Sequence, residues 1–221
     1  MDELQAMRER HSVRSYTDRP IEGATLEALQ RFVEQCSRES GLHLQLVLDE
    51  PEAFSGRMAH YGRFSGVRNY VVLAGEKGPD LEERCGYYGE KIVLFAQMLG
   101  LNTCWVAMTY RRGCAAGQLR PGERLCLVIA VGYGETNGVP HKMKPRERVM
   151  DVEAPPPDWF LRGVDAALLA PTAMNQQKFQ FTLRGSTVTA TAGIGFYSRI
   201  DLGIAKYHFE LGAGRENFTW G

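Results

Sequence analysis

Residues 80–99 constrain the fold most, because they are apolar on nearly every side of a helix. Apolar side chains recur at helical spacing along one stripe from Leu81 to Leu99. Further apolar residues, among them Val93 and Met98, occupy the opposite side. A helix without a polar face is buried by the rest of the chain. The chain has 221 residues, which is enough for a substantial core around such a helix.

Two glycines interrupt this helix. Gly86 and Gly89 each cost about 1 kcal/mol of helix stability relative to alanine. Their lack of a side chain therefore indicates that something approaches the backbone at these positions. Either a neighbouring helix or a ligand could explain the two glycines. Gly100 follows the last apolar residues and is predicted to terminate the helix.

Periodicity predicts the remaining elements. Apolar residues spaced three and four apart indicate helices, and alternating or continuous apolar runs indicate strands. Helices are predicted over residues 1–9, from a Thr25 cap to Gly41, from an Asp158 cap to Leu168, and over residues 199–211. Strands are predicted over residues 42–48, 69–74, 103–108, 125–132, 178–183 and 187–191, and residues 50–67 as a loop with at most a short helix.

The clearest boundary in the chain is the proline run at residues 155–157. Three successive prolines exclude a helix and favour a stiff, extended linker. The order helix, strands, helix then occurs a second time. The sequence therefore predicts two parts, residues 1–153 and a shorter part at residues 154–221, related by a degenerate tandem duplication.

Composition excludes several classes of protein. The chain is 44% hydrophobic and its 26 basic residues balance 26 acidic ones, which argues against disorder and against nucleic acid as a partner. No apolar run approaches the roughly 20 residues that span a bilayer, and the acidic N-terminus is unlike a signal peptide. The expectation is a cytoplasmic protein without a membrane partner.

Cysteine and histidine spacing gives no metal pattern. The five cysteines are odd in number and none form a C-x-x-C pair, so reduced and mostly buried thiols are expected. The five histidines show neither H-x₃-H nor H-E-x-x-H spacing. A catalytic Cys–His pair stays open, although no motif indicates one.

Cations gather in two places. Arg10, Ser12 and Arg14 alternate, so on an extended segment they point the same way and offer two guanidinium groups and a hydroxyl to a phosphate or planar anion. A second cluster, residues 141–148, follows the strand at 125–132 and could serve the same anion. For both clusters, a solvated basic surface is the alternative.

Several blocks together resemble the FMN-dependent nitroreductase family. The Arg10-x-Ser12-x-Arg14 start resembles the family's opening, and Lys144-Pro145-Arg146 resembles its Lys-x-Arg pair. Residues 98–105 look like the end of its central helix and the strand that passes the flavin. Residues 170–177, Ala-Pro-Thr-Ala-Met-Asn-Gln-Gln, look like its Ala-Pro-Ser-x-x-Asn-x-Gln motif. These blocks cover most of the chain.

One departure from the family pattern bears on architecture. The Asn-x-Gln block follows the first long helix in the ordinary family, whereas here it follows the proline linker. This order resembles a nitroreductase subgroup in which one chain imitates the usual two-subunit assembly. The resemblance implies an α+β fold with a central, mostly antiparallel sheet flanked by helices. It also implies an internal pseudo-dimer with one FMN site built from both halves, as a monomer or a homodimer.

The resemblance also implies which residues bind FMN. Cations would hold the phosphate, and amides and one further cation would face the ring; no catalytic side chain is named. The residues implied for the phosphate are Arg10, Ser12, Lys144 and Arg146. Those implied for the ring are Arg14, Asn175, Gln177 and a backbone N–H of Ala107 or Met108. His11 is also implied as a cofactor-binding residue.

The implied activity is reduction of a small-molecule electron acceptor. NADH or NADPH would reduce FMN, and a nitroaromatic, quinone or related acceptor would then be reduced by a ping-pong mechanism. No dinucleotide fingerprint chooses between the two donors. The alternatives are another flavin chemistry on the same fold, such as reductive dehalogenation or flavin destruction, and a non-catalytic flavin-binding or storage protein.

Overall fold

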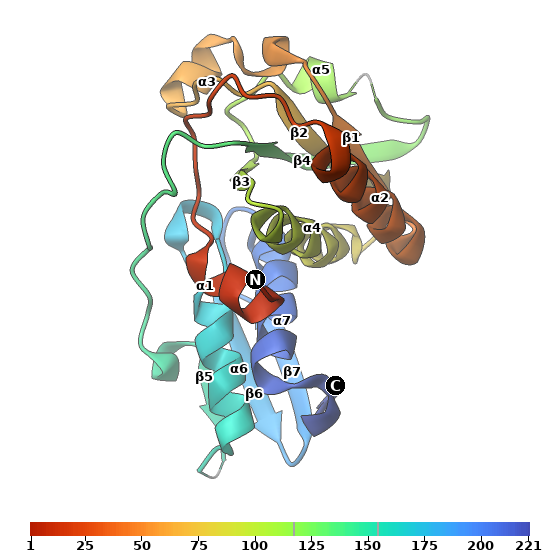
Figure 1. Ribbon diagram of the computed structural model, residues 1–221. Helices are drawn as coiled ribbons and strands as arrows, with labels where there is room; N and C mark the ends of the chain where they lie inside the picture. Colours follow the sequence, from red (N-terminus) through yellow and green to blue (C-terminus); the bar gives the residue numbers. More distant parts are fainter. Residues whose placement is uncertain (117, 154) are drawn as a thin grey trace.

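The computed structural model describes residues 1–116, 118–153 and 155–221 (Figure 1). The helices are α1 (Glu3–Glu9), α2 (Gly23–Ser40), α3 (Arg57–Tyr61), α4 (Leu81–Met98), α5 (Arg112–Ala116), α6 (Asp158–Leu168) and α7 (Ser198–Ala213). The strands are β1 (His43–Val47), β2 (Asn69–Glu76), β3 (Asn102–Val106), β4 (Glu123–Gly132), β5 (Met150–Val152), β6 (Phe179–Arg184), β7 (Thr187–Ala192) and β8 (Thr219–Trp220). Short 3₁₀ turns lie at Pro51–Phe54, Arg146–Arg148, Ala173–Asn175 and Arg215–Asn217.

The first sheet is fully antiparallel, with strand order β1-β2-β4-β3. Its central strands are apolar runs buried on both faces. Alternate residues of β2 enter different cores, because successive side chains of a strand point to opposite faces. Val71 and Leu73 join the core shared with α4, whereas Tyr70 and Val72 join a second core beneath the loops at residues 50–67.

The second sheet, order β5-β6-β7-β8, is mixed. Its centre is the β6–β7 hairpin that turns at Gly185, and β5 and β8 pair in parallel with its outer edges. Helices α6 and α7 pack side by side against this part of the molecule (Figure 1). Phe181 of β6 stacks on Phe209 of α7, with ring centroids 4.5 Å apart, so the helix is anchored to the sheet by aromatic packing.

Helices α4 and α7 join the two parts at the centre of the molecule (Figure 1). The crossing is close because each helix presents a glycine: a Cβ at Gly86 would overlap the Ile200 carbonyl, and one at Gly203 would overlap the Glu83 carbonyl. Gly89 faces the indole of Trp105 instead. The two glycines of α4 thus accommodate a neighbouring helix and an aromatic ring.

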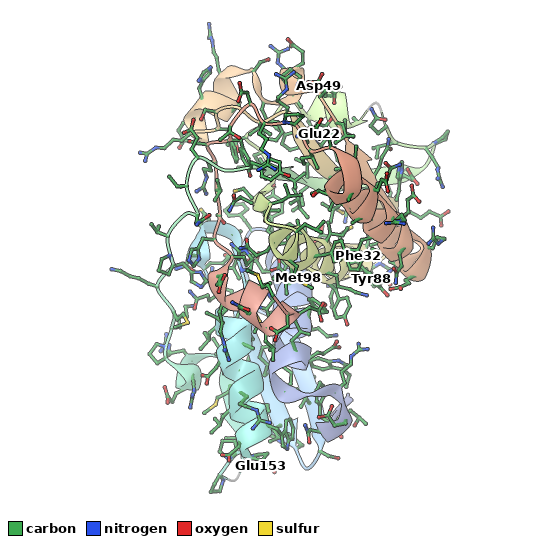
Figure 2. All side chains as sticks on the ribbon, in the orientation of Figure 1. Glu22, Phe32, Asp49, Tyr88, Met98 and Glu153 are labelled. Carbon is green, nitrogen blue, oxygen red and sulfur yellow. The ribbon has the colours of Figure 1, made fainter. Side chains whose placement is uncertain are left out.

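Helix α2 covers the other side of α4. Phe32 of α2 stacks on Phe95 of α4 at 4.1 Å between centroids. Figure 2 labels Phe32 and Tyr88 where the two helices meet. With α2, α7 and the first sheet around it, α4 is buried as its apolar sequence predicts.

The α+β class and the antiparallel sheet are confirmed, and each predicted helix and strand is present. Two caps are wrong: α2 begins at Gly23, ahead of Thr25, and Asp158 is the first helical residue of α6, with Pro157 at the cap position and no side-chain capping bond. Residue 154 of the predicted linker lies outside the described residues. None of the described helices has the length and apolar character needed to cross a membrane.

Candidate functional site

A cleft lies where the N-terminal segment, β3 and the start of α7 meet. It consists of two adjoining pockets that share Ser12, Arg14, Pro171, Thr172 and Met174. The first, the apolar pocket, has a volume of about 130 Å³. The second, the cationic pocket, has a volume of about 330 Å³. Apolar side chains from three elements line the first: Cys104, Trp105, Val106, Ala107, Leu127, Tyr197, Ile200 and Ile204.

The N-terminal segment reaches the cleft by docking on the free edge of the first sheet. Ser12 forms a bridge with Thr103 of β3, and the Val13 amide donates to the Thr103 carbonyl at 3.0 Å. Val13 is buried in the core, while Arg10, Ser12 and Arg14 line the cationic pocket. The alternation expected of an extended segment therefore gathers these three side chains at one cleft.

Arg10 is the most unusual of these residues. Its side chain is only 5% exposed, yet Nε and Nη1 have no hydrogen-bond partner among the described residues. A buried guanidinium without a counter-ion costs several kcal/mol. Such a group indicates that an anion belongs in the cationic pocket.

Two histidines share the cationic pocket with Arg10. Burial lowers the pKa of His11, and the positive charges of Arg10 and His141 lower it further. The Nε2–H of His141 donates to the Leu168 carbonyl at 2.9 Å, which fixes the orientation of this ring. None of the described residues that line the cationic pocket is acidic, so these residues bring only positive or neutral side chains.

The segment at residues 171–177 forms one wall of both pockets, and its backbone is strained. Met174, Asn175 and Gln177 have φ of 50°, 53° and 43°, the left-handed region that non-glycine residues rarely occupy. The Asn175 amide donates to the Lys142 carbonyl at 2.8 Å, and the Gln177 amide donates to the same carbonyl at 2.7 Å. The segment is thereby tied to the chain at residues 142–144.

Of the described residues that line the two pockets, Asp201 alone is acidic. It is 2% exposed and lies in the first turn of α7. Its Oδ1 accepts from the Ala173 amide at 3.0 Å and its Oδ2 from the Gln176 Nε2 at 2.7 Å. Burial raises the pKa of Asp201 to about 6, although the two hydrogen bonds oppose this shift.

A buried polar network supports the wall formed by Trp105. The indole Nε1 donates to Glu90 at 3.0 Å, and the other oxygen of this carboxyl lies 2.9 Å from His208 Nε2. The His208 Nδ1–H donates to the Ala166 carbonyl at 3.0 Å. Because Glu90 and His208 are fully buried, these bonds hold the indole in one orientation.

The structure brings six of the predicted site residues together in the cleft: Arg10, His11, Ser12, Arg14, Ala107 and Asn175.

It places the other four elsewhere. Met108 is 66% exposed and lines neither pocket. Lys144 Nζ donates to the Gln176 and Gln177 carbonyls at 2.7 and 3.0 Å, and Gln177 is 2% exposed beneath the segment. Arg146 is paired with Asp165 of α6.

Sequence reasoning missed Tyr197 and Asp201. Tyr197 directly precedes α7 and Asp201 lies in its first turn, a region that the sequence predicted only as a helix over residues 199–211. One signal was present, because Asp201 stands between two apolar residues, Ile200 and Leu202. Among the described residues, no group of three or more His, Cys, Asp or Glu side chains could hold a metal ion.

Comparisons with solved structures agree with this fold. A structure described as a "putative nitroreductase" from Thermotoga maritima shares 23% identity over 98% of this chain and 85% of its own, with a TM-score of 0.65. A structure described as a "putative nitroreductase in complex with fmn" from Desulfovibrio desulfuricans shares 19% identity over 71% of this chain and 99% of its own, at a TM-score of 0.54.

A third structure, an FMN and NADPH-dependent nitroreductase variant from Sphigopyxis sp. strain HMH, shares 19% identity over 68% of this chain and 98% of its own, at a TM-score of 0.55. At these identities the likeness shows the fold. No curated protein matches the sequence significantly.

Residues 2–213 match the family model described as "Putative TM nitroreductase", which is nearly the whole chain. The chain therefore belongs to this nitroreductase family.

Proposed function

We propose that the protein is an FMN-dependent oxidoreductase that uses NADH or NADPH to reduce a nitroaromatic, a quinone or a related acceptor. The observation that carries the proposal is Arg10, a buried guanidinium with two unpartnered nitrogens at one end of the cleft. Membership of the nitroreductase family and the FMN complex of one structural neighbour support the choice of ligand.

The residues present fit FMN. A phosphate monoester carries a charge near −2 and strong acceptor oxygens, which suit Arg10 and the hydroxyl of Ser12 in the cationic pocket. A flat, largely apolar ring suits the adjoining apolar pocket, where Trp105 and Ile204 offer apolar surface. When bound, FMN supplies the ability to accept a hydride from a nicotinamide and to pass it to an acceptor.

The chain itself would bind and tune the group. Arg14 lines both pockets, and a cation against a flavin ring raises its reduction potential. Ala107 lines the apolar pocket, and its backbone N–H would be the group offered to a ring placed there. The wall at residues 171–177 would be fixed by Asn175, Gln177 and Lys144. Arg146 would tie the 3₁₀ turn at Arg146–Arg148 to α6 through Asp165. Donor and acceptor would use the open cleft in turn, which is a ping-pong scheme.

The first test is an absorbance scan of the purified protein, followed by anaerobic titration with NADH and then NADPH. A flavin peak that bleaches identifies the donor, and reoxidation by menadione or nitrofurazone establishes turnover. A flavin that binds but does not turn over would favour a storage role. A protein that stays colourless after addition of FMN would overturn the proposal.

The second test removes the guanidinium. Arg10→Met should weaken FMN binding about 10- to 100-fold, because a charged hydrogen bond contributes about 1.5–3 kcal/mol. The same change should stabilise the flavin-free protein, because an unpartnered buried charge disappears. Arg8→Met, at an exposed position of α1, is the matched control. Unchanged FMN affinity in the Arg10 variant would remove this residue from the site.

A further inference from the structure

We propose that His141 binds the phosphate group of the ligand in the cationic pocket, where Nδ1 of its ring takes up a proton as the anion enters and then donates a hydrogen bond to it. The proposal rests on the proposed function for the identity of the ligand, FMN. The contact itself involves only a phosphate group, so it can be tested with inorganic phosphate and without flavin.

Of the described residues 141–148, which form the second basic cluster, His141 alone lines the cationic pocket. The two cations expected to bind phosphate are engaged elsewhere. Lys144 Nζ donates to two carbonyls of the segment at residues 171–177, and Arg146 is paired with a carboxylate of α6. A contact between this cluster and an anion in the pocket therefore falls to His141.

One ring nitrogen of His141 is fixed and the other is left to titrate. Nε2 lies 2.9 Å from the carbonyl of Leu168, which can only accept, so Nε2 carries a hydrogen in both protonation states. Nδ1 has no hydrogen-bond partner among the described residues and is the atom that gains the proton. Neutral Nδ1 offers a lone pair, which repels an anion, whereas protonated Nδ1 offers a donor.

A phosphate monoester requires more positive charge than Arg10 alone supplies. Its charge is near −2, whereas Arg10 contributes one buried positive charge, and Arg14 is exposed and shared between both pockets. His11 is the other imidazole of the pocket, but burial lowers its pKa, and the charges of Arg10 and His141 lower it further. His141 is therefore the better source of a second charge at the phosphate.

The charges around His141 oppose its protonation until an anion is present. Basic side chains share its pocket or follow it in the chain: Arg10, His11, Arg14, Lys142 and Lys144. The opposing influence is the C-terminal end of α6, where the Leu168 carbonyl accepts from the ring and the helix dipole favours a charged imidazole. Asp165 of α6 is already paired with Arg146, and the wall at residues 171–177 carries no ionisable side chain. An entering phosphate therefore supplies the negative charge that a protonated His141 needs.

Proton and phosphate favour one another, because two linked binding equilibria affect each other equally. The affinity that His141 contributes is present where its ring is charged and is lost as the pH rises above neutral. Protonation of the phosphate, with a pKa of about 6, has the opposite sign and affects every variant alike. The contribution of His141 is therefore measured above that pH, as a ratio of dissociation constants.

The test compares the dissociation constants of FMN for His141→Gln and wild type, measured by fluorescence quenching from pH 6.5 to pH 9. Glutamine keeps an N–H for the Leu168 carbonyl but cannot titrate. We expect the variant to bind FMN about 10-fold more weakly at pH 6.5 and equally well at pH 9, since a charged hydrogen bond is lost only where the imidazole is charged. His60→Gln, at an exposed position of α3, should match wild type throughout. A ratio that does not change with pH would overturn the proposal.

A measurement without flavin distinguishes the failure of this proposal from that of the proposed function. NMR of the imidazole nitrogens follows the titration of each histidine, and the His141 signals are identified by their loss in His141→Gln. Inorganic phosphate, added at constant ionic strength, should raise the titration midpoint of His141 and leave that of the exposed His60 unchanged. If the His141 midpoint rises and FMN does not bind, the proposed function fails and the phosphate contact stands. An unmoved midpoint, or an equal rise at His60, overturns the role of His141 even if FMN binds.

Discussion

At the residue scale, the cleft contains two buried charges in opposite situations. In the part of the chain that the structure describes, Arg10 has no partner for two of its nitrogens, whereas both oxygens of Asp201 accept hydrogen bonds. A missing partner indicates a ligand, and a complete set of partners indicates a structural role. We therefore propose ligand recognition for Arg10, whereas the bonds of Asp201 hold residues 173–176.

The raised pKa of Asp201 predicts a pH dependence of stability. In the unfolded chain an aspartate has a pKa near 3.8, and in the folded protein the value is about 6. The folded state therefore holds this proton more tightly. The resulting stabilisation is fully present below about pH 3.8 and is lost as the pH rises through about 6.

The matched measurement is the free energy of unfolding of flavin-free wild type and Asp201→Asn in urea at several pH values. The difference, variant minus wild type, should increase by about 2.4 kcal/mol between pH 4 and pH 7, because each pKa unit corresponds to 1.36 kcal/mol and part of the change lies below pH 4. Other titrating groups cancel in this difference. A difference that does not change with pH would show that Asp201 has an ordinary pKa in the folded protein.

The cations show how much of the candidate site can be predicted from the sequence. Arg10, Ser12 and Arg14 were placed together because one extended segment fixes their directions. Lys144 and Arg146 could not be placed in this way, because their partners, the Gln176 carbonyl and Asp165, lie 32 and 19 residues away. Asp201 was missed for the same reason, since its role depends on a packing contact with residues 173–176.

At the scale of elements, the crossing of α4 and α7 is set by glycines. Gly203→Ala should destabilise the protein by about 2 kcal/mol or more, because its Cβ would overlap backbone of α4 that cannot move aside. Gly113→Ala in α5 is the matched control, since a Cβ there meets nothing within 4 Å and alanine favours the helix by up to about 1 kcal/mol. Thermal unfolding of both variants checks the prediction; equal melting temperatures would contradict it.

Elements with a long apolar signal were predicted well. Helix α4 and strands β2 and β4 lie within two residues of their predicted bounds, because burial on several sides leaves an unmistakable pattern. Strand β8 and helix α5 were not predicted, since two and five residues are too few to show a period. The division of the strands into two sheets could not be predicted either, because it depends on which edges pair.

At the scale of the whole molecule, the two parts share one core. A single cluster of buried apolar residues includes Leu73 of the first sheet, Phe181 of the second, and α4 and α7 between them. The order α2-β1-β2-α4 is followed by α6-β6-β7-α7, as a duplication would produce. An internal pseudo-dimer remains our proposal for this arrangement, with residues 1–153 and 154–221 completing one another.

A shared core predicts that the parts do not fold separately. Urea unfolding of the whole chain should give one transition, with coincident curves from far-ultraviolet circular dichroism and tryptophan fluorescence. Residues 1–153 expressed alone should lack a cooperative transition, since α4 would lose α7 and expose Leu94, which clusters with Ala166 and Tyr207. Two separated transitions in the whole chain, or a cooperatively folded fragment, would contradict this expectation.

The position of Trp105 gives the cleft a natural optical probe. The chain has three tryptophans. Trp159 and Trp220 pack around Phe218 at the far end of the second sheet, whereas Trp105 forms part of the wall of the apolar pocket. A yellow chromophore seated against this indole would accept its excitation energy, so a loss of tryptophan emission would report occupancy of the cleft. A titration with the proposed ligand could therefore be followed without any attached label.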